Sequence, residues 1–333
     1  MLLHAMDSNF ENQVCLGSGI SFLLLVFFVS LPNGFILMVM VKNPLRCFKR
    51  VFSVYLAFIS ATDLFVGLVV CPAQVLVRFL CVFSDRSIPQ EGEIVQILSY
   101  IGINCSILLV TAMSIDRFVA VIFPHTYRQR MKPKTAVVCN SCIIVFSSIF
   151  ASLQLTNISK DVYIAIDIHL HTTSPLSTTS VAYLGIFYFL KKQSRVAVQR
   201  QATMPSNTSL NDRKRERTAK MEKNFATTSF LILMFLILSL IPYFAVMVVG
   251  IHCESCVKKN WFFIVRESST VILFLNSVVN PFLASFCINE MKKSCAIVLG
   301  LKRQDDETAS ARFSSVTAPM QCRPGESTKT DLV

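Results

Sequence analysis

The chain of 333 residues is 53% hydrophobic and only 16% charged, and its mean hydropathy is +0.55. Because a soluble domain carries about a quarter charged residues, this composition argues against a soluble enzyme and favours a protein embedded in a bilayer. The net charge of +12 would suggest a nucleic-acid partner in a soluble protein. Here the positions of the basic residues along the chain are explained by the topology of a membrane protein. We therefore expect no nucleic-acid partner.

Seven apolar stretches are each long enough to cross a bilayer as a helix, which takes about 20 residues. The first lacks the basic start and the cleavage site of a signal peptide. The fifth is the least typical, because it contains Asp167, His169 and His171. The predicted spans are Leu16–Val41, Val51–Val77, Ile94–Ile115, Thr135–Thr156, Val162–Leu190, Asn224–Ile251 and Ser268–Ile288.

The predicted fold class is therefore an all-α membrane protein, a seven-transmembrane helix bundle. Residues 1–15 form an outer N-terminus, residues 16–288 the bundle, residues 289–300 an amphipathic helix at the membrane, and residues 301–333 a disordered tail. All but six of the 32 Lys and Arg residues lie after the first, third, fifth and seventh spans. Since Lys and Arg stay on the cytoplasmic side, the N-terminus is predicted to be extracellular and the C-terminus cytoplasmic.

Four of the 12 cysteines fall at the outer rim, where a disulfide can persist. They are Cys15, Cys81, Cys253 and Cys256. The spacing of Cys253 and Cys256 favours either a local bridge or a pairing of one of them with Cys15. Connectivity stays open, because spacing alone does not choose a partner.

Asp63, in the second span, is the clearest ionisable residue at membrane depth. Such residues are costly in a bilayer and usually face the bundle interior. We expect polar partners for it on the first, third and seventh spans, namely Asn33, Ser106, Asn276 and Asn280. Two hypotheses remain open: a protonated, purely structural aspartate, or a small polar cavity that takes a cation.

Several motifs at fixed intervals carry a family resemblance. Asp63 is followed nine residues later by Pro72, and Asp116-Arg117-Phe118 ends the third span. The others are Pro32-Asn33-Gly34 in the first span, the Pro175 and Tyr183 pair, Glu222 twenty residues before Pro242, and Asn280-Pro281. From about Leu16 to Cys295 the chain resembles the rhodopsin-like (class A) G-protein-coupled receptors.

The resemblance implies a plasma-membrane receptor, without a catalytic site, that passes an extracellular ligand signal to a heterotrimeric G protein as span six moves outward. At rest Arg117 would pair with Asp116 and Glu222, and Tyr183 would belong to the same coupling region. The only cofactor implied is an allosteric sodium ion at Asp63, Ser106, Asn276 and Asn280. Arrestin would be a second partner, and Cys295 would be palmitoylated.

Some family positions are changed. Leu240 replaces the usual tryptophan of span six, Ala284 replaces the usual tyrosine of span seven, and Gly92 replaces the cysteine near the top of span three. The missing disulfide and the short second outer loop give a weak similarity to melanocortin and lipid receptors. The losses at Leu240 and Ala284 keep open a weakly coupling receptor-like scaffold. A transporter or channel is the less favoured alternative.

The ligand is an unknown small molecule, lipid or peptide. Span seven has no lysine for a retinal Schiff base, and Ser99 stands where amine receptors have an aspartate. Asp167 is the predicted anchor for a polar or cationic ligand, unless Asp167 and His171 satisfy each other. The full predicted ligand set is Gln96, Ser99, Asp167, His171, Tyr243, Met247, Glu267 and Thr270.

Two predictions concern the segments outside the spans. Asn157 lies in the sequon Asn157-Ile158-Ser159 of the second outer loop and is a predicted glycosylation site. The tail ends in Asp331-Leu332-Val333, which matches the pattern of a PDZ-domain ligand.

Overall fold

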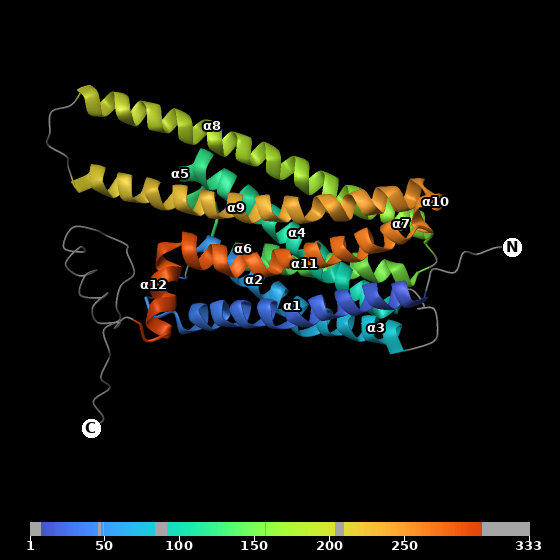
Figure 1. Ribbon diagram of the computed structural model, residues 1–333. Helices are drawn as coiled ribbons and strands as arrows, with labels where there is room; N and C mark the ends of the chain where they lie inside the picture. Colours follow the sequence, from blue (N-terminus) through green and yellow to red (C-terminus); the bar gives the residue numbers. More distant parts are fainter. Residues whose placement is uncertain are drawn as a thin grey trace.

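The computed structural model describes residues 8–45, 48, 50–83, 92–156, 158–203 and 210–301. Within these ranges it leaves the side chains of residues 8, 93, 128, 160, 161, 193–203, 210–226 and 287 undescribed. The described part is a bundle of long helices (Figure 1). Its helices, in chain order, are α1 (Ser8–Lys42), α2 (Val51–Phe65), η1 (Val66–Val70), α3 (Cys71–Phe83), α4 (Glu93–Ile122), α5 (Pro124–Arg130), α6 (Pro133–Ser152), η2 (Leu153–Leu155), α7 (Lys160–Asp167), η3 (Ile168–Thr173), α8 (Ser174–Thr203), α9 (Leu210–His252), α10 (Glu254–Val257), α11 (Asn260–Cys287) and α12 (Asn289–Val298).

Six helices are long and apolar enough to cross a membrane: 9–42, 51–83, 94–122, 133–155, 227–252 and 260–286. The predicted fifth span corresponds to the helical run α7–η3–α8, which is not among these six. Its many polar residues, including Asp167 and His171, explain why composition alone does not pick it out. Together with this run, the bundle has the predicted seven long helical segments.

The helices extend beyond the predicted apolar limits. The first begins at Ser8 rather than Leu16, and the second ends at Phe83 rather than Val77. Hydropathy marks the part of a helix that lies in lipid, whereas backbone hydrogen bonds continue into the polar boundary. The extra turns matter here, because they place Cys15 and Arg78 inside helices rather than in outer segments.

Two turns of π-helix lie directly before prolines. The segment η1 precedes Cys71-Pro72, and η3 precedes Ser174-Pro175. A proline lacks an N–H donor and its ring crowds the carbonyl four residues earlier, so the preceding turn widens. His171 lies within the second of these widened turns.

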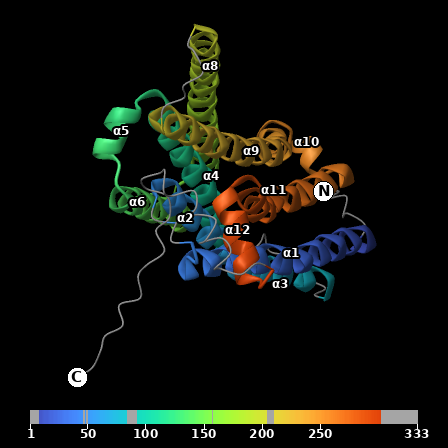
Figure 2. The same ribbon diagram turned by 90° about the vertical axis from the view of Figure 1, so that its left-hand side faces the viewer.

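The helix α4 lies at the centre and packs against α2, α6, α8 and α9, while α1 packs against α3 and α11. In Figure 1 both ends of the bundle can be followed: α12 lies at one end, here named the α12 end, and α10 lies at the other, here named the α10 end. Figure 1 shows the backbone of α8 diverging from that of α9 toward the α12 end, and Figure 2 shows α8 standing apart from the other helices.

Gly185 sets how closely α8 approaches α4. A Cβ at this position would lie 2.5 Å from the ring of Phe118. Phe118 is the third residue of the Asp116-Arg117-Phe118 motif, so any larger residue at 185 would push α8 away from it. This contact explains how α8 stays anchored to α4 while its far end diverges.

Two disulfides lie at the α10 end. Cys15 of α1 is bonded to Cys81 of α3, with their Cα atoms 6.3 Å apart, and Cys253 is bonded to Cys256. The local bridge was one of the two open hypotheses for Cys253 and Cys256. The alternative, in which one of them pairs with Cys15, is wrong because Cys15 is already bonded to Cys81.

Candidate functional site

Asp63 is fully buried at the middle of the bundle, where α2, α4 and α11 meet. The amide of Asn280 donates to Asp63 Oδ2 at 2.8 Å, and the Ser106 hydroxyl donates to Oδ1 at 3.5 Å. Asn33 of α1 instead donates to the Ser277 carbonyl at 3.0 Å. The Asp63 carboxylate on α2 thus accepts one hydrogen bond from α11 and one from α4, and so it links the three helices.

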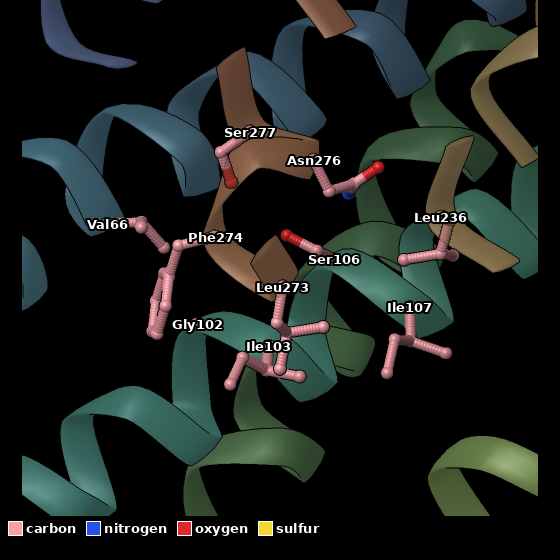
Figure 3. Close-up of a pocket in the computed structure, with 10 residues that line it drawn as sticks. All are labelled: Val66, Gly102, Ile103, Ser106, Ile107, Leu236, Leu273, Phe274, Asn276 and Ser277. Carbon is pink, nitrogen blue, oxygen red and sulfur yellow. The ribbon is translucent and has the colours of Figure 1, made fainter. Parts of the chain in front are cut away.

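A small cavity of about 20 Å³ adjoins this group, which is room for about one water molecule. Figure 3 shows the hydroxyls of Ser106 and Ser277 directed toward the same space between the helices, with Phe274 at one side. Three side-chain oxygens in this region, on Asn33, Asn276 and Asn280, are buried without a hydrogen-bond partner among the described residues. Buried acceptors without donors suit a water molecule or a cation.

A second polar cluster lies toward the α12 end of α4. Arg117 and Asp116 are both 3% exposed and pair directly, with Arg117 Nε 3.0 Å from Asp116 Oδ2. The Tyr127 hydroxyl of α5 donates to Asp116 Oδ1 at 2.9 Å and accepts from Arg117 Nη2 at 2.9 Å. Arg117 also lies over the ring of Phe52, 5.1 Å from its centroid. The ring centroid of Tyr127 lies 5.8 Å from the same guanidinium, so two aromatic rings contact this charged group.

Two positions that differ from the family pattern are filled by apolar side chains. Leu240 and Ala284 are buried in the main core, with exposed fractions of 6% and 0%. Tyr183 of α8 accepts a hydrogen bond from Ser114 of α4 at 3.5 Å and packs edge-on against Phe230 of α9, with ring centroids 5.3 Å apart. Tyr183 thus connects α8 to both α4 and α9.

Asp167 and His171 interact with each other. Nδ1 of His171 lies 3.0 Å from Asp167 Oδ1, and the amide of Asn104 on α4 donates to the same oxygen at 2.9 Å. His171 is 1% exposed and packs edge-on against Phe150, with ring centroids 4.8 Å apart. Asp167 and His171 therefore pair with each other, as one hypothesis expected, while Nε2 of His171 is buried without a hydrogen-bond partner among the described residues.

A third polar network links α3, α4 and α11 near the α10 end. Arg78 and Glu267 form an ion pair at 2.9 Å, with both side chains at least nine-tenths buried. Arg78 also donates to the side chain of Gln74, whose amide donates to the Ser99 hydroxyl at 2.7 Å. Two of the predicted ligand residues, Ser99 and Glu267, thus belong to one network.

The family of the chain follows from comparison with known proteins. The model of the 7 transmembrane receptor (rhodopsin family) matches residues 32–283. The chain belongs to this family. A search of curated proteins finds no match.

A solved structure similar to this receptor is the crystal structure of squid rhodopsin. The TM-score is 0.74 at 15% sequence identity, and the alignment covers 92% of this chain and 93% of the squid chain. At this identity the likeness concerns the fold. The receptor is accordingly a multi-pass plasma-membrane protein of a signalling class that responds to extracellular ligands through G proteins, and it is not an enzyme.

The remaining predicted ligand residues of the receptor are not brought into one cluster. Tyr243 and Met247 lie half-buried on α9, and Gln96 is half-buried on α4. The Thr270 hydroxyl donates to the carbonyl of Arg266 in its own helix. None of the predicted ligand residues lines the cavity beside Asp63.

Some predictions fall outside the described residues. They are the side chain of Glu222, the sequon residue Asn157 and the tail from residue 302 onward. Cys295 is described, and it faces the bundle at 8% exposed. Burial raises the pKa of its thiol, and a hydrogen bond from Ser285 partly opposes that rise. Acylation of Cys295 requires that this thiol first become accessible.

Three residues of the site were missed in the sequence: Arg78, Gln74 and Tyr127. Arg78 was assigned to an outer segment, because it directly follows the predicted end of the second span. This assignment is wrong, since the helix continues to Phe83 and Arg78 is 3% exposed. Extension of the predicted span by one residue would have placed Arg78 on the same helix face as Gln74, because they are four residues apart.

Proposed function

We propose that the receptor couples an extracellular ligand to a heterotrimeric G protein through outward movement of α9 at the α12 end. The observation that carries this proposal is the buried cluster of Asp116, Arg117 and Tyr127. An arginine that is bound by a carboxylate and a hydroxyl can exchange these partners for others with little change in its own position. Release of Arg117 toward a G protein would be that exchange.

The α12 end is the cytoplasmic end in this proposal, and the N-terminus is extracellular. The support is the distribution of Lys and Arg, which crowd the segments after the first, third, fifth and seventh helices. In the structure, the backbones of α8 and α9 also diverge toward this end (Figure 1). Arrestin would use the same end, and a PDZ domain would bind Asp331-Leu332-Val333 at the end of the tail.

The Asp63 cavity is proposed as a sodium site with Asp63, Ser106, Asn276 and Asn280 around it. Its support is chemical. The region holds one carboxylate, a hydroxyl and three amide oxygens without donors, and hard cations take oxygen ligands. The ion would stabilise the arrangement of α2, α4 and α11 found here, because it would hold side chains from all three helices.

A weakly coupling receptor-like scaffold is the second candidate. The observation that favours it is the apolar packing of Leu240 and Ala284, because no aromatic ring or hydroxyl occupies these two positions to change partners during activation. Tyr183 bonds to Ser114 within this arrangement. Activation would then have to pass through the contacts of Tyr183 with α4 and α9.

The deciding experiment is basal output of cAMP and calcium in cells that express the wild type, Asp116→Asn or Glu222→Ala at matched surface levels. If the proposal holds, either substitution frees Arg117 and raises one of the two messengers. That messenger identifies the coupled pathway without a ligand. Unchanged cAMP and calcium in all three proteins, despite normal surface expression, would support the scaffold instead.

A further inference from the structure

The two disulfides at the α10 end differ in their access to solvent. Cys15 and Cys81 are 2% and 5% exposed and pack with Phe263 in an apolar cluster, so their bond is here named the shielded bridge. Cys253 and Cys256 are half-exposed, and both residues between them are exposed, so their bond is here named the open bridge. A thiolate must reach a disulfide sulfur to attack it, and access therefore helps to set the rate of thiol–disulfide exchange.

Ser255 distinguishes the two sulfur atoms of the open bridge. Its hydroxyl lies 3.5 Å from Sγ of Cys253. Because a disulfide sulfur carries no proton, the hydroxyl is the donor in this contact. A hydrogen bond to sulfur favours the charged thiolate. Cys253 is therefore the better leaving group, and Cys256 is the sulfur that a thiolate attacks with more success.

The open bridge lies in the turn that joins α9 to α11. Cys253 directly follows the last residue of α9, and its N–H donates to the carbonyl of Val249 at 2.9 Å. On the other side of the turn, the N–H of Lys259 donates to the carbonyl of Cys256 at 3.0 Å, directly before α11 begins. The two bridged residues thus take part in the backbone hydrogen bonds at both ends of the turn.

The two helices pack closely beside this turn. A Cβ at Gly250 of α9 would lie 3.7 Å from the ring of Phe262 on α11, and Phe262 is 5% exposed. The N–H of Phe262 donates to the carbonyl of Lys259 at 3.0 Å, so the position of its ring depends on the same turn. Opening of the bridge gives the turn more freedom and so weakens the contact between the ends of α9 and α11.

We propose that the open bridge is a site of reversible reduction by an extracellular dithiol, and that its reduction loosens the outer end of α9 from α11. This inference rests on the proposed function, which places the α10 end outside the cell and assigns the activating movement to α9. The shielded bridge keeps α1 and α3 joined while the open bridge reacts.

The reaction is a thiol–disulfide exchange in two steps. One thiolate of the dithiol attacks Sγ of Cys256, the bond between Cys256 and Cys253 breaks, and its electron pair leaves on Sγ of Cys253, which the Ser255 hydroxyl stabilises and water then protonates. The second thiolate of the dithiol attacks the dithiol's own sulfur in the mixed disulfide and releases Cys256, which is protonated in turn. The receptor gains two electrons and two protons, and the dithiol is oxidised to a disulfide.

The first test compares both bridges within one molecule, the purified full-length receptor in lipid nanodiscs. Free thiols are blocked with N-ethylmaleimide, dithiothreitol is added, and new thiols are labelled at successive times with a second maleimide and assigned by peptide mass spectrometry. Cys253 and Cys256 should be labelled at least about tenfold faster than Cys15 and Cys81. A second arm replaces dithiothreitol with reduced thioredoxin. Labelling in both arms identifies a bridge that a protein dithiol can reach, whereas labelling with dithiothreitol alone restricts the reductant to small dithiols.

Ser255 is tested as a positioning residue. Ser255→Ala should slow the labelling of Cys253 and Cys256 about threefold, because one hydrogen bond to the leaving sulfur is lost, and it should leave the shielded bridge unchanged. Ser255→Thr keeps a hydroxyl and should restore the rate. A serine that only stabilised the turn would have the opposite effect, because its removal would make the bridge more accessible.

A second measurement follows the turn itself by amide hydrogen exchange, at a dithiothreitol concentration that leaves the shielded bridge intact. The N–H groups of Cys253 and Lys259 should exchange about tenfold faster after reduction. The paired variant Cys253→Ser with Cys256→Ser has no bridge to reduce. It should show the faster exchange both with and without dithiothreitol.

Three results would overturn the inference: equal labelling rates of the two bridges, labelling of Ser255→Ala as fast as that of the wild type, or exchange that does not change on reduction. None of these readouts needs a G protein, so the messenger experiment stays a separate test. If reduction and faster exchange are found while cAMP and calcium do not respond in that experiment, the reducible site stands and the proposed coupling fails.

Discussion

The hydroxyl of Tyr127 lies 2.9 Å from Arg117 Nη2, so a residue of the short helix α5 holds the arginine at the end of α4. The same hydroxyl donates to Asp116. The position of helix α5 therefore depends on the same hydrogen bonds that hold Asp116 and Arg117 together. Movement of this short segment would change the partners of Arg117.

Tyr127→Phe should raise basal signalling. The substitution keeps the ring but removes two hydrogen bonds to charged groups, and a net loss of about 1 kcal/mol would shift the resting equilibrium about fivefold. The measurement is basal cAMP or calcium at matched surface expression. Tyr188→Phe is the control, because Tyr188 is 71% exposed. Equal basal output from both variants would show that Tyr127 does not restrain Arg117.

Sodium should stabilise the receptor through Asp63. When sodium is tenfold above its Kd, a site of this kind adds about 1.4 kcal/mol of stability. The measurement is the Tm in sodium chloride against choline chloride at equal ionic strength. Asp63→Asn should abolish the difference, while Asp167→Asn should retain it. A sodium effect that survives in Asp63→Asn would place the ion elsewhere.

The two disulfides should differ in their contribution to stability. Cys15 and Cys81 are 66 residues apart, whereas Cys253 and Cys256 are three apart. The chain-entropy relation gives about 4 kcal/mol for the longer loop and about 2 kcal/mol for the shorter. Cys15→Ser with Cys81→Ser should therefore lower Tm more than Cys253→Ser with Cys256→Ser. The opposite order would mean that the α1–α3 packing holds without the bridge.

The Cys295 thiol should resist alkylation. Burial raises its pKa, so the reactive thiolate appears only at higher pH than for an exposed thiol. The control is a cysteine introduced as Leu299→Cys on a Cys295→Ser background, because Leu299 is 58% exposed just after the same helix. Reaction with a water-soluble maleimide across a pH series compares the two. Matching pH profiles would show that Cys295 is accessible and open to palmitoylation.

Much of the fold could be predicted from the sequence, because it depends on local hydropathy. Six of the seven helical segments follow from apolar length, and the fifth is harder to recognise because of its polar residues. The neighbours of Asp63 could be predicted because few polar residues occur at that depth of the bundle. Ser106 and Asn280 were among the few residues able to form a hydrogen bond with its carboxylate. That Asn280 rather than Asn276 donates to the carboxylate depends on the rotation of α11, which no sequence pattern specifies.

The outer network could not be predicted in the same way. Arg78 lies at the edge of an apolar run. A charged residue at such an edge is predicted to lie in water, outside the membrane span. Its burial depends on Glu267, a residue 189 positions away on a helix whose depth and rotation are set by packing. Likewise, Tyr127 reaches Arg117 only because α5 folds back after Pro124, and the proline marks where the helix starts but not its direction.

The burial of Asp63 has an electrical consequence. The carboxylate lies within the part of the bundle that spans the bilayer, so a cation drawn to it from the outer face crosses part of the membrane field. Moving one elementary charge through the whole field changes the free energy by about 2.3 kcal/mol per 100 mV. If the cavity holds the proposed sodium ion, its occupancy would therefore follow the membrane potential.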